Sequence, residues 1–245
     1  MIWDRPRAGT EPIYRRKTMN SIDIMLKDID AVIFDLDGTL IDSMGVWSDV
    51  DRNYLARFGI EMPENLPDML SGISISQVAD YFREKLGVNR TNEQMLADWN
   101  EMAFEEYRSS VPAKPGAMRW LKALRDRNIS MAVGTSNSKK LAQTAVDAQN
   151  FRPFIQVLLT GEDVVKGKPD PCIYLLAAQR LGADPSRCLV FEDLPAGLTA
   201  GRRAGMKTCA VFDLYSRNED GQKRSIADYY IRDFEDIFAD RAEVL

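Results

Sequence analysis

Two aspartates one residue apart, Asp35 and Asp37, stand at the end of an apolar run, Ala31–Phe34, with Gly38 and Thr39 directly behind them. In an extended segment the side chains of residues i and i+2 point to the same face, so both carboxylates would crowd one place. Two like charges at close range raise each other's pKa unless another charge neutralises them. The pair therefore predicts a bound cation, a held proton or a reaction at this point of the chain.

Three further polar segments follow apolar runs or open helical patterns. They hold Thr135 with Ser136 and Asn137 in MAVGTSNS, Lys168 in KGKPDP, and Glu192 with Asp193 in LVFEDLPAG. Ligands of open parallel sheets bind beyond the carboxyl ends of the strands. We therefore expect the aspartate pair and these three segments to converge on one edge of a sheet.

The composition narrows the chemistry that these residues could perform. The sequence of 245 residues contains no histidine, which excludes Ser-His-Asp and Cys-His catalysis and any zinc site with histidine ligands. Catalysis must then use carboxylates, lysine, hydroxyl groups or a metal ion. A net charge of −5 argues against a nucleic-acid partner. No stretch has the ~18 apolar residues of a membrane span, and three scattered cysteines indicate reduced thiols and a cytoplasmic location.

The elements that would position these residues are short apolar runs that alternate with helical patterns. The runs are Ala31–Phe34, Ile129–Val133, Ile155–Thr160, Cys188–Phe191, Lys207–Val211 and Tyr229–Ile231, and the helical patterns are Ser138–Ala148, Pro171–Leu181 and Pro195–Ala204. Strands that alternate with helices in this way predict an α/β fold with a Rossmann-like parallel sheet covered on both faces.

A long insertion, residues 44–112, separates the first predicted strand from the second and is expected to be helical throughout. Apolar residues recur there at helical spacing in three stripes: Trp47, Val50, Tyr54 and Phe58; Ile75, Val78, Phe82 and Leu86; and Met95, Trp99 and Met102. We therefore predict an α/β core formed by residues 28–43 and 113–245, a small helical module at 44–112, and a loose N-terminal extension at 1–27, with order beginning near Ile29.

The four polar segments resemble the motifs of a known family. DLDGTL, the hydroxyl of VGTSNS, the lysine of KGKPDP and VFEDLPAG match, in order, the four motifs of the haloacid dehalogenase superfamily of phosphotransferases. The resemblance extends from about Ile29 to the C-terminus. The insertion is similar to the helical C1-type cap of that superfamily, in its sugar-phosphate phosphatase and β-phosphoglucomutase branch.

The resemblance implies a Mg²⁺ site and an aspartyl-phosphate intermediate. A carboxylate attacks a phosphoryl group only if the repulsion between two anions is overcome, and Mg²⁺, a hard cation with oxygen ligands, does this. Asp35 would be the nucleophile and a metal ligand, Asp193 the second carboxylate ligand and Glu192 an auxiliary ligand. Asp37 would protonate the leaving alkoxide and then deprotonate the attacking water, and its backbone carbonyl would face the metal.

The remaining candidates would hold the substrate. Thr135 and Lys168 would bind the phosphoryl oxygens, and Lys168 would also balance the acidic cluster. Further candidates for substrate or phosphate contacts are Gly38, Thr39, Ser136, Asn137 and Trp47. We expect a small phosphorylated metabolite, a sugar or polyol phosphate, as the substrate, and a monomer or weak dimer without a nucleic-acid or membrane partner.

Each polar segment also has a purely structural interpretation. The alternatives are a turn at Asp37–Thr39, a helix cap at Thr135 or Ser136, a solvated Lys168, and acids at a helix N-terminus at Glu192–Asp193. Any one motif alone is weak evidence, whereas four in the expected order favour the chemical interpretation.

Two other functions compete with a phosphatase. The β-phosphoglucomutase branch places a histidine in the first cap helix and an arginine after a later turn, and rough alignment puts Trp47 and Ile75 at these positions. The absence of both residues weakens the mutase hypothesis, because a bisphosphate intermediate needs positive charge in the cap.

Asp37 argues against a haloalkanoate dehalogenase, which lacks that aspartate. A catalytically silent binding or regulatory protein is the third hypothesis.

Overall fold

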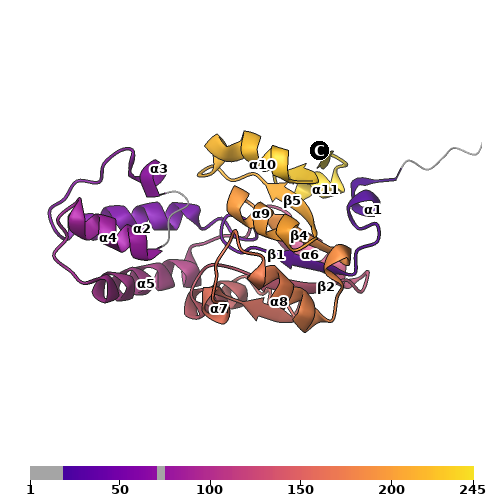
Figure 1. The fold of residues 1–245 in the computed structure, drawn as a ribbon, viewed down its shortest axis with the longest axis horizontal. Helices are drawn as coiled ribbons and strands as arrows, with labels where there is room; N and C mark the ends of the chain where they lie inside the picture. Colours follow the sequence, from indigo (N-terminus) through magenta and orange to yellow (C-terminus); the bar gives the residue numbers. More distant parts are fainter. Residues whose placement is uncertain (1–18, 71–74) are drawn as a thin grey trace, which may run out of the picture.

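In the part of the chain that the structure describes, seven strands form one sheet. It lies within the larger part of the molecule, away from the end formed by α2 to α5 (Figure 1). The structure is a computed structural model and describes residues 19–70 and 75–245, apart from the side chains of residues 67 and 68. The strands are β1 (Ala31–Phe34), β2 (Ser130–Gly134), β3 (Val157–Leu159), β4 (Cys188–Glu192), β5 (Lys207–Val211), β6 (Tyr229–Ile231) and β7 (Glu243–Val244). Their spatial order is β3-β2-β1-β4-β5-β6-β7, and every pair is parallel except β6 with β7. The predicted α/β fold with a parallel sheet is confirmed.

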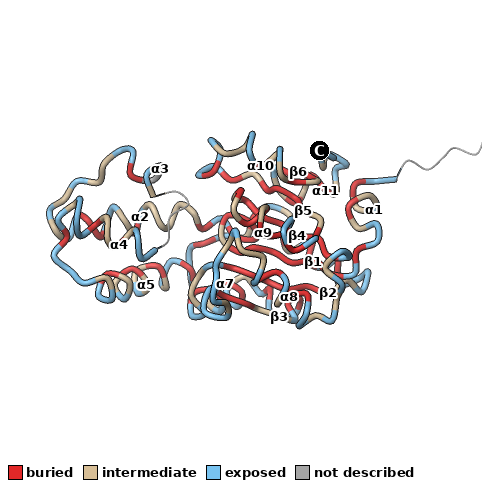
Figure 2. Tube along the Cα trace, in the orientation of Figure 1, coloured by how far each residue is buried: buried red, intermediate tan, exposed pale blue. Residues whose placement is uncertain are grey.

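Strand β1 lies in the middle of this sheet, between β2 and β4. All four of its residues are buried (Figure 2), because helices cover both faces and leave no solvated side. Ala31 and Ile33 pack on one face, whereas Val32 and Phe34 pack on the other, as the alternation of side chains along a strand requires. The residue after β1, Asp35, is therefore held at the centre of the carboxyl edge.

Helices cover both faces of the sheet. On one face lie α8 (Cys172–Leu181) and α9 (Pro195–Arg203), with α10 (Asp220–Ile226) against α9; on the other lie α6 (Ala117–Arg125), α7 (Lys139–Ala148), α11 (Glu235–Phe238) and α1 (Ser21–Met25). Short 3₁₀ helices occupy Gly161–Asp163, Pro185–Arg187 and Arg217–Glu219. Among the described residues no helix is both long and apolar enough to cross a membrane.

The insertion forms a helical unit, the cap, at one end of the molecule (Figure 1). Its helices are α2 (Met44–Ala56), α3 (Leu66–Leu70), α4 (Ile75–Glu84) and α5 (Asn92–Ser109). The ring of Trp99 lies edge-on to Tyr54 at 5.6 Å and to Phe82 at 5.1 Å, so one aromatic cluster joins α2, α4 and α5. Ile75 departs from the predicted stripe because its side chain is 45% exposed at the start of α4.

The two chain crossings between core and cap lie side by side. The amide of Asp42 donates to the carbonyl of Pro112, and the amide of Lys114 donates to the carbonyl of Leu40, both at 2.9 Å. The Lys114 ammonium is buried and donates to Asp213 at 2.6 Å, which ties the second crossing to the segment after β5. Both crossings are therefore anchored to the core.

The N-terminal segment differs from the prediction. Residues 1–18 lie outside the described residues, but Ser21–Met25 form α1 within the stretch expected to be loose. Asn20 caps this helix, and Met25 is only 1% exposed because α1 packs against α11, far away in the sequence. The order that we expected from Ile29 thus begins earlier.

Candidate active site

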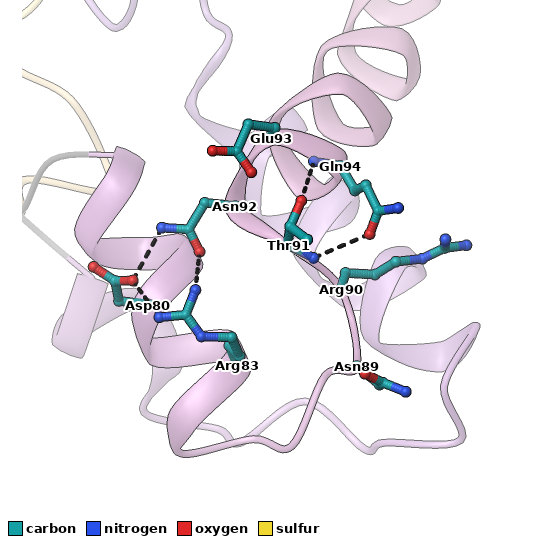
Figure 3. A pocket seen from close by; sticks show the side chains of 8 residues that line it. All are labelled: Asp80, Arg83, Asn89, Arg90, Thr91, Asn92, Glu93 and Gln94. Carbon is teal, nitrogen blue, oxygen red and sulfur yellow. Dashed lines mark hydrogen bonds and ion pairs between the residues drawn. The ribbon is translucent and has the colours of Figure 1, made fainter.

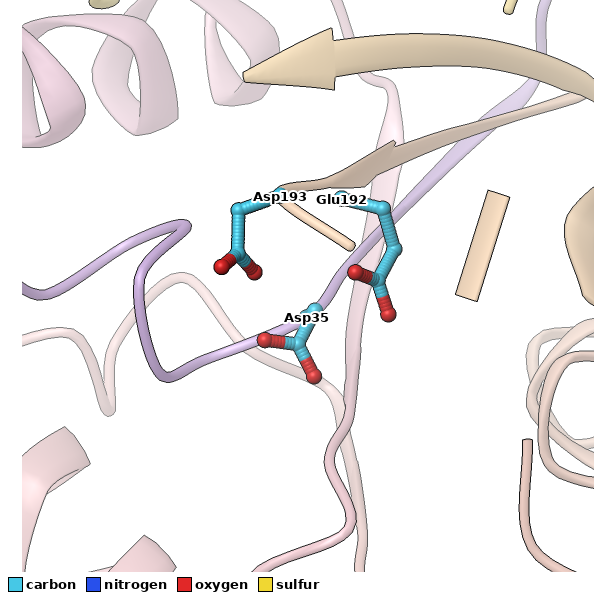
Figure 4. Close-up of side chains that lie close together, drawn as sticks. All are labelled: Asp35, Glu192 and Asp193. Atoms are coloured by element: carbon cyan, nitrogen blue, oxygen red, sulfur yellow. The ribbon is translucent and has the colours of Figure 1, made fainter. Parts of the chain in front are cut away.

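Three buried carboxylates meet at the carboxyl edge of the sheet. Asp35 follows β1, Glu192 ends β4 and Asp193 follows it. One oxygen from each lies within 4.8 Å of the others, and Figure 4 shows the three side chains close together. The two neighbouring parallel strands β1 and β4 end together, which is why residues that are distant in sequence meet here.

Lys168 supplies positive charge to this cluster. Its ammonium donates to Asp35 Oδ1 and to Glu192 Oε1, each at 2.5 Å, and the hydroxyl of Tyr174 donates to Glu192 Oε1 at 2.9 Å. Burial would lower the pKa of Lys168, but the charges of Asp35 and Glu192 outweigh it and raise that pKa well above its usual value. Lys168 is therefore charged and bridges two acids, rather than being solvated.

The cluster has more negative than positive charge. Burial raises the pKa of Asp35 well above its ordinary value of 3.8, although the Lys168 ammonium acts in the opposite direction. Burial and the charges of Glu192 and Asp35 likewise raise the pKa of Asp193. One ammonium does not compensate three carboxylates in a site that excludes water. The cluster thus favours a further cation.

The donor set fits a hard divalent cation such as Mg²⁺. Asp193 Oδ2 is buried and has no hydrogen-bond partner among the described residues, an arrangement that is costly for a polar atom unless it has a ligand. Carboxylate oxygens are the ligands that Mg²⁺ prefers. Asp35, Asp193 and Glu192, the predicted carboxylate ligands, are the residues that could hold the ion.

Two glycines make room for the acids. A Cβ on Gly38, whose φ is +78°, would lie 2.7 Å from Asp193 Cγ, and a Cβ on Gly197 would lie 2.7 Å from Glu192 Cγ. Both distances are far inside ordinary carbon contact. Thr39, fully buried, donates from its hydroxyl to Asp193 Oδ1 at 3.0 Å. Gly38 and Thr39 are predicted to contact phosphate. In the structure the amide of Gly38 donates to the carbonyl of Ile41 and the hydroxyl of Thr39 donates to Asp193, and a phosphate contact remains a prediction.

The carboxylate of Asp37 lies apart from the acidic cluster. Its Oδ1 accepts from the hydroxyl of Ser43 at 2.6 Å and from the hydroxyl of Tyr107. Its Oδ2 accepts from Asn137 Nδ2 at 3.0 Å and from Thr135 Oγ1 at 3.4 Å.

The two aspartates have different hydrogen-bond partners, although they follow the same strand. Strand β1 ends at Phe34, the chain turns, and Asp37 pairs with Ile41 in an isolated bridge. The charge of Asp37 still contributes to raising the pKa of Asp35, so the two carboxylates remain neighbours. The predicted metal contact of Asp37 concerned its backbone carbonyl and stays a prediction.

The segment after β2 supplies polar groups to Asp37. Thr135 is buried and its hydroxyl accepts from the amide of Asn137 at 3.1 Å, while Ser136 is exposed. The cap of the next helix, α7, is Ser138, whose hydroxyl accepts from the amide of Leu141 at 3.4 Å. The alternative that Thr135 or Ser136 merely caps this helix is therefore wrong.

Sequence reasoning missed Tyr107, which joins the cap to Asp37. It comes from α5 and is 1% exposed. Trp47, predicted to contact substrate, is half-buried and donates from its indole nitrogen to the Tyr107 hydroxyl at 3.1 Å. Burial and the charge of Asp37 raise the pKa of Tyr107 well above its ordinary value of 10.0. A signal was present, because the stripe of Met95 and Trp99 continues at four-residue spacing to Tyr107.

A separate hollow of about 550 Å³ lies between the end of α4 and the start of α5 (Figure 3). Its lining is polar, but the charged groups bind each other: Arg83 donates to Asp80 at 2.7 Å and also to Asn92. Thr91 and Gln94 form the capping box of α5. None of its lining residues belongs to the acidic cluster or contacts Asp37, so the chemistry lies elsewhere.

Comparison with known proteins identifies the family of the chain. A family model described as haloacid dehalogenase-like hydrolase matches residues 32–211. The chain belongs to this family. Hexitol phosphatase A of Escherichia coli (strain K12) is 33% identical over 179 residues, covering 73% of this chain and 81% of that protein. The phosphorylated carbohydrates phosphatase of Thermotoga maritima is 27% identical over 179 residues, covering 73% and 83%.

A solved structure shows that the whole architecture is shared. The crystal structure of β-phosphoglucomutase from Clostridium difficile superposes with a TM-score of 0.70 at 21% identity, over 87% of this chain and 97% of that one. At this identity the similarity concerns the fold alone. Relatives of this haloacid dehalogenase-like hydrolase are named as phosphatases, and the chain is a phosphoric monoester hydrolase.

Proposed function

We propose that this hydrolase is a Mg²⁺-dependent phosphatase that releases phosphate from a small phosphorylated sugar or polyol through an aspartyl-phosphate on Asp35. The observation that carries the proposal is the cluster at the sheet edge: Asp35 is paired with Lys168, and the buried Asp193 Oδ2 beside them has no hydrogen-bond partner in the described structure. The names of relatives that act on hexitol phosphates and phosphorylated carbohydrates support the substrate class.

Asp35 is the group suited to attack phosphorus. It is 6% exposed, so little water solvates the carboxylate and its oxygen is available to an incoming phosphoryl group. Bound by Asp35, Asp193 and Glu192, Mg²⁺ would neutralise charge on these carboxylates and on the phosphoryl oxygens. Lys168 and Thr135 would hold phosphoryl oxygens, since both lie at this edge of the sheet and carry donors.

Asp37 is the group suited to move protons. Its carboxylate is separate from the acidic cluster and is held by hydroxyl and amide donors rather than by an ammonium. Asp37 would give a proton to the leaving oxygen while the phosphoryl group is transferred to Asp35. It would then take a proton from the water that hydrolyses the aspartyl-phosphate. Two carboxylates in different environments can thus serve as nucleophile and as acid/base.

The experiment is a phosphate-release screen over sugar and polyol phosphates, with and without Mg²⁺, run beside an assay for isomerisation of β-glucose 1-phosphate. We expect Mg²⁺-dependent phosphate release from some of these substrates, abolished in Asp35→Asn and retained in the control Asp147→Asn, whose carboxylate pairs with Arg152 on the surface. Isomerisation faster than phosphate release would favour the mutase hypothesis. No turnover of any substrate, including an aryl phosphate, would favour the silent protein. The cytoplasmic location and the monomer or weak dimer also remain predictions.

A further inference from the structure

The hydroxyl of Tyr107 makes all three hydrogen bonds that a tyrosine hydroxyl can make. Trp47 Nε1 lies 3.1 Å from it and Asn137 Nδ2 lies 3.2 Å from it, and both of these groups are donors only. The hydroxyl must therefore accept from both. Its single proton is left for the third partner, Asp37 Oδ1. The direction of the Tyr107–Asp37 bond thus follows from counting donors and acceptors.

This bond connects two parts of the fold. Tyr107 lies in α5 of the cap, whereas Asp37 follows β1 of the core. The same face of α5 touches α7 and its N-cap residue: the ammonium of Lys140 lies 4.2 Å from the centre of the Phe104 ring, and Ser138 Oγ donates to Asn100 Oδ1 at 3.4 Å. Residues 100, 104 and 107 share one helix face, so the docking of α5 on α7 brings the Tyr107 hydroxyl to Asp37.

The other contacts of Asp37 come from the core and from the first crossing. Ser43 shares Oδ1 with Tyr107, while Asn137 and Thr135 hold Oδ2. Without the Tyr107 hydroxyl, Oδ1 would keep only one donor, from a residue close to it in sequence. The orientation of this carboxylate then depends on α5 being in place.

We propose that Tyr107 is a positioning residue that fixes the Asp37 carboxylate for proton transfer to the leaving oxygen when the cap is docked on the core. The inference rests on the proposed phosphatase function. Trp47 supports Tyr107 from α2 through its indole hydrogen bond and through an edge-on ring contact at 6.3 Å. Two cap helices therefore hold the Tyr107 hydroxyl in place. The orientation of Asp37, the proton donor, is fixed only when the cap is docked on the core.

The test compares Tyr107→Phe with Tyr54→Phe. Tyr54 is a matched control because it is also a buried cap tyrosine whose hydroxyl donates to an aspartate, Asp98 at 3.0 Å, but it has no contact with Asp37. We would measure kcat/KM with a polyol phosphate and with 4-nitrophenyl phosphate. This constant reports the transfer to Asp35, and the aryl leaving group needs no proton. Positioned proton transfer contributes about 10²–10⁴ in rate, so the ratio of alkyl to aryl kcat/KM should fall about tenfold or more in Tyr107→Phe and stay unchanged in Tyr54→Phe.

A second measurement follows the hydrogen bond without turnover. The chain has four tryptophans, and the indole N–H signal of Trp47 is identified in a ¹⁵N spectrum by its loss in Trp47→Phe. We expect this signal to shift in Tyr107→Phe and to stay in place in Tyr54→Phe. An unchanged signal in Tyr107→Phe, or equal losses with the two substrates, would overturn the proposal.

Two further outcomes are distinguishable. If the wild-type protein releases no phosphate from either substrate, the proposed function fails, whatever the variants do. If Tyr107→Phe does not fold, as judged by circular dichroism, Trp47→Phe takes its place, because it removes the donor that holds the Tyr107 hydroxyl. A fall in the alkyl-to-aryl ratio of about threefold or more would then support the role of Tyr107. An unchanged ratio would overturn it.

Discussion

Replacement of Lys168 by methionine tests the electrostatics of the site most simply. The methionine keeps most of the aliphatic stem but removes the ammonium that lies 2.5 Å from both Asp35 and Glu192. The side chains of the three residues are only 8%, 9% and 2% exposed, so water does not replace the lost charge. Removing one partner from a buried ion pair costs about 3–5 kcal/mol. We therefore expect Lys168→Met to lower the free energy of unfolding by about this amount at pH 8 without metal.

The decrease in the free energy of unfolding caused by Lys168→Met should grow as pH rises. The pKa of Asp35 is raised in the folded protein, so its contribution to stability is present at low pH and is lost as pH rises from 3.8 through the folded pKa. The Lys168 ammonium lowers the pKa of Asp35. Removing this ammonium raises that pKa further, so the stability contributed by Asp35 goes on falling up to a higher pH. The deficit of Lys168→Met should thus be larger at pH 8 than at pH 5.5.

The assay is urea unfolding at both pH values, with and without Mg²⁺. Lys166→Met, an exposed lysine two residues away, is the control and should change the free energy of unfolding by no more than about 0.5 kcal/mol. Mg²⁺ should recover part of the stability lost in Lys168→Met, because it also neutralises the carboxylates. A deficit below about 1 kcal/mol, or one that is equal at both pH values, would refute the assignment of Lys168 as the charge that holds this cluster together.

Three other substitutions follow from the structure. Gly197→Ala places a Cβ 2.7 Å from Glu192 Cγ and should lower Mg²⁺-dependent phosphatase activity by about 100-fold or more, whereas Gly221→Ala, which meets nothing within 4 Å, should not; steady-state kinetics on both variants would decide. Asp193→Asn removes charge at the unpartnered Oδ2 and should weaken Mg²⁺ binding by about tenfold or more in a calorimetric titration, and an unchanged affinity would contradict the metal assignment. Burial raises the pKa of Asp51 to about 7, so the contribution of Asp51 to stability is lost as pH rises from 3.8 through about 7. In urea unfolding, Asp51→Asn should therefore stabilise the protein by about 1–2 kcal/mol at pH 8.5 and progressively less toward pH 4.5. A gain in stability that does not depend on pH would be inconsistent with this.

The strands of the core were predictable because buried strands appear in the sequence as continuous apolar runs. The apolar runs Ala31–Phe34, Lys207–Val211 and Tyr229–Ile231 coincide with β1, β5 and β6, since strands covered on both faces are continuously apolar. Strand β7 was missed because its two residues are exposed and carry no pattern. Helix α1 was missed because its burial depends on α11, more than 200 residues later in the chain.

The acidic cluster was predictable from strand ends, whereas the surroundings of Asp37 were not. Polar residues after parallel strands converge on one edge, and this placed Asp35, Glu192 and Lys168 together in advance. The contact of Asp37 with Tyr107 depends on how α5 lies against α7, a packing between two helices that no local spacing specifies. A pattern can predict that Tyr107 is buried, but not which partner it meets.

The central claim, a covalent aspartyl-phosphate on Asp35, is tested most directly by trapping it. An acid quench within the first turnover, followed by peptide mass spectrometry, should find a phosphoryl group on the peptide that contains Asp35, and the label should be released by hydroxylamine, as an acyl phosphate requires. With 4-nitrophenyl phosphate, whose leaving group needs no proton, the label should accumulate further in Asp37→Asn, which lacks the base for hydrolysis. It should be absent in Asp35→Asn. Phosphate release by the wild-type enzyme with no label on Asp35 at any quench time, together with continued turnover by Asp35→Asn, would contradict the account.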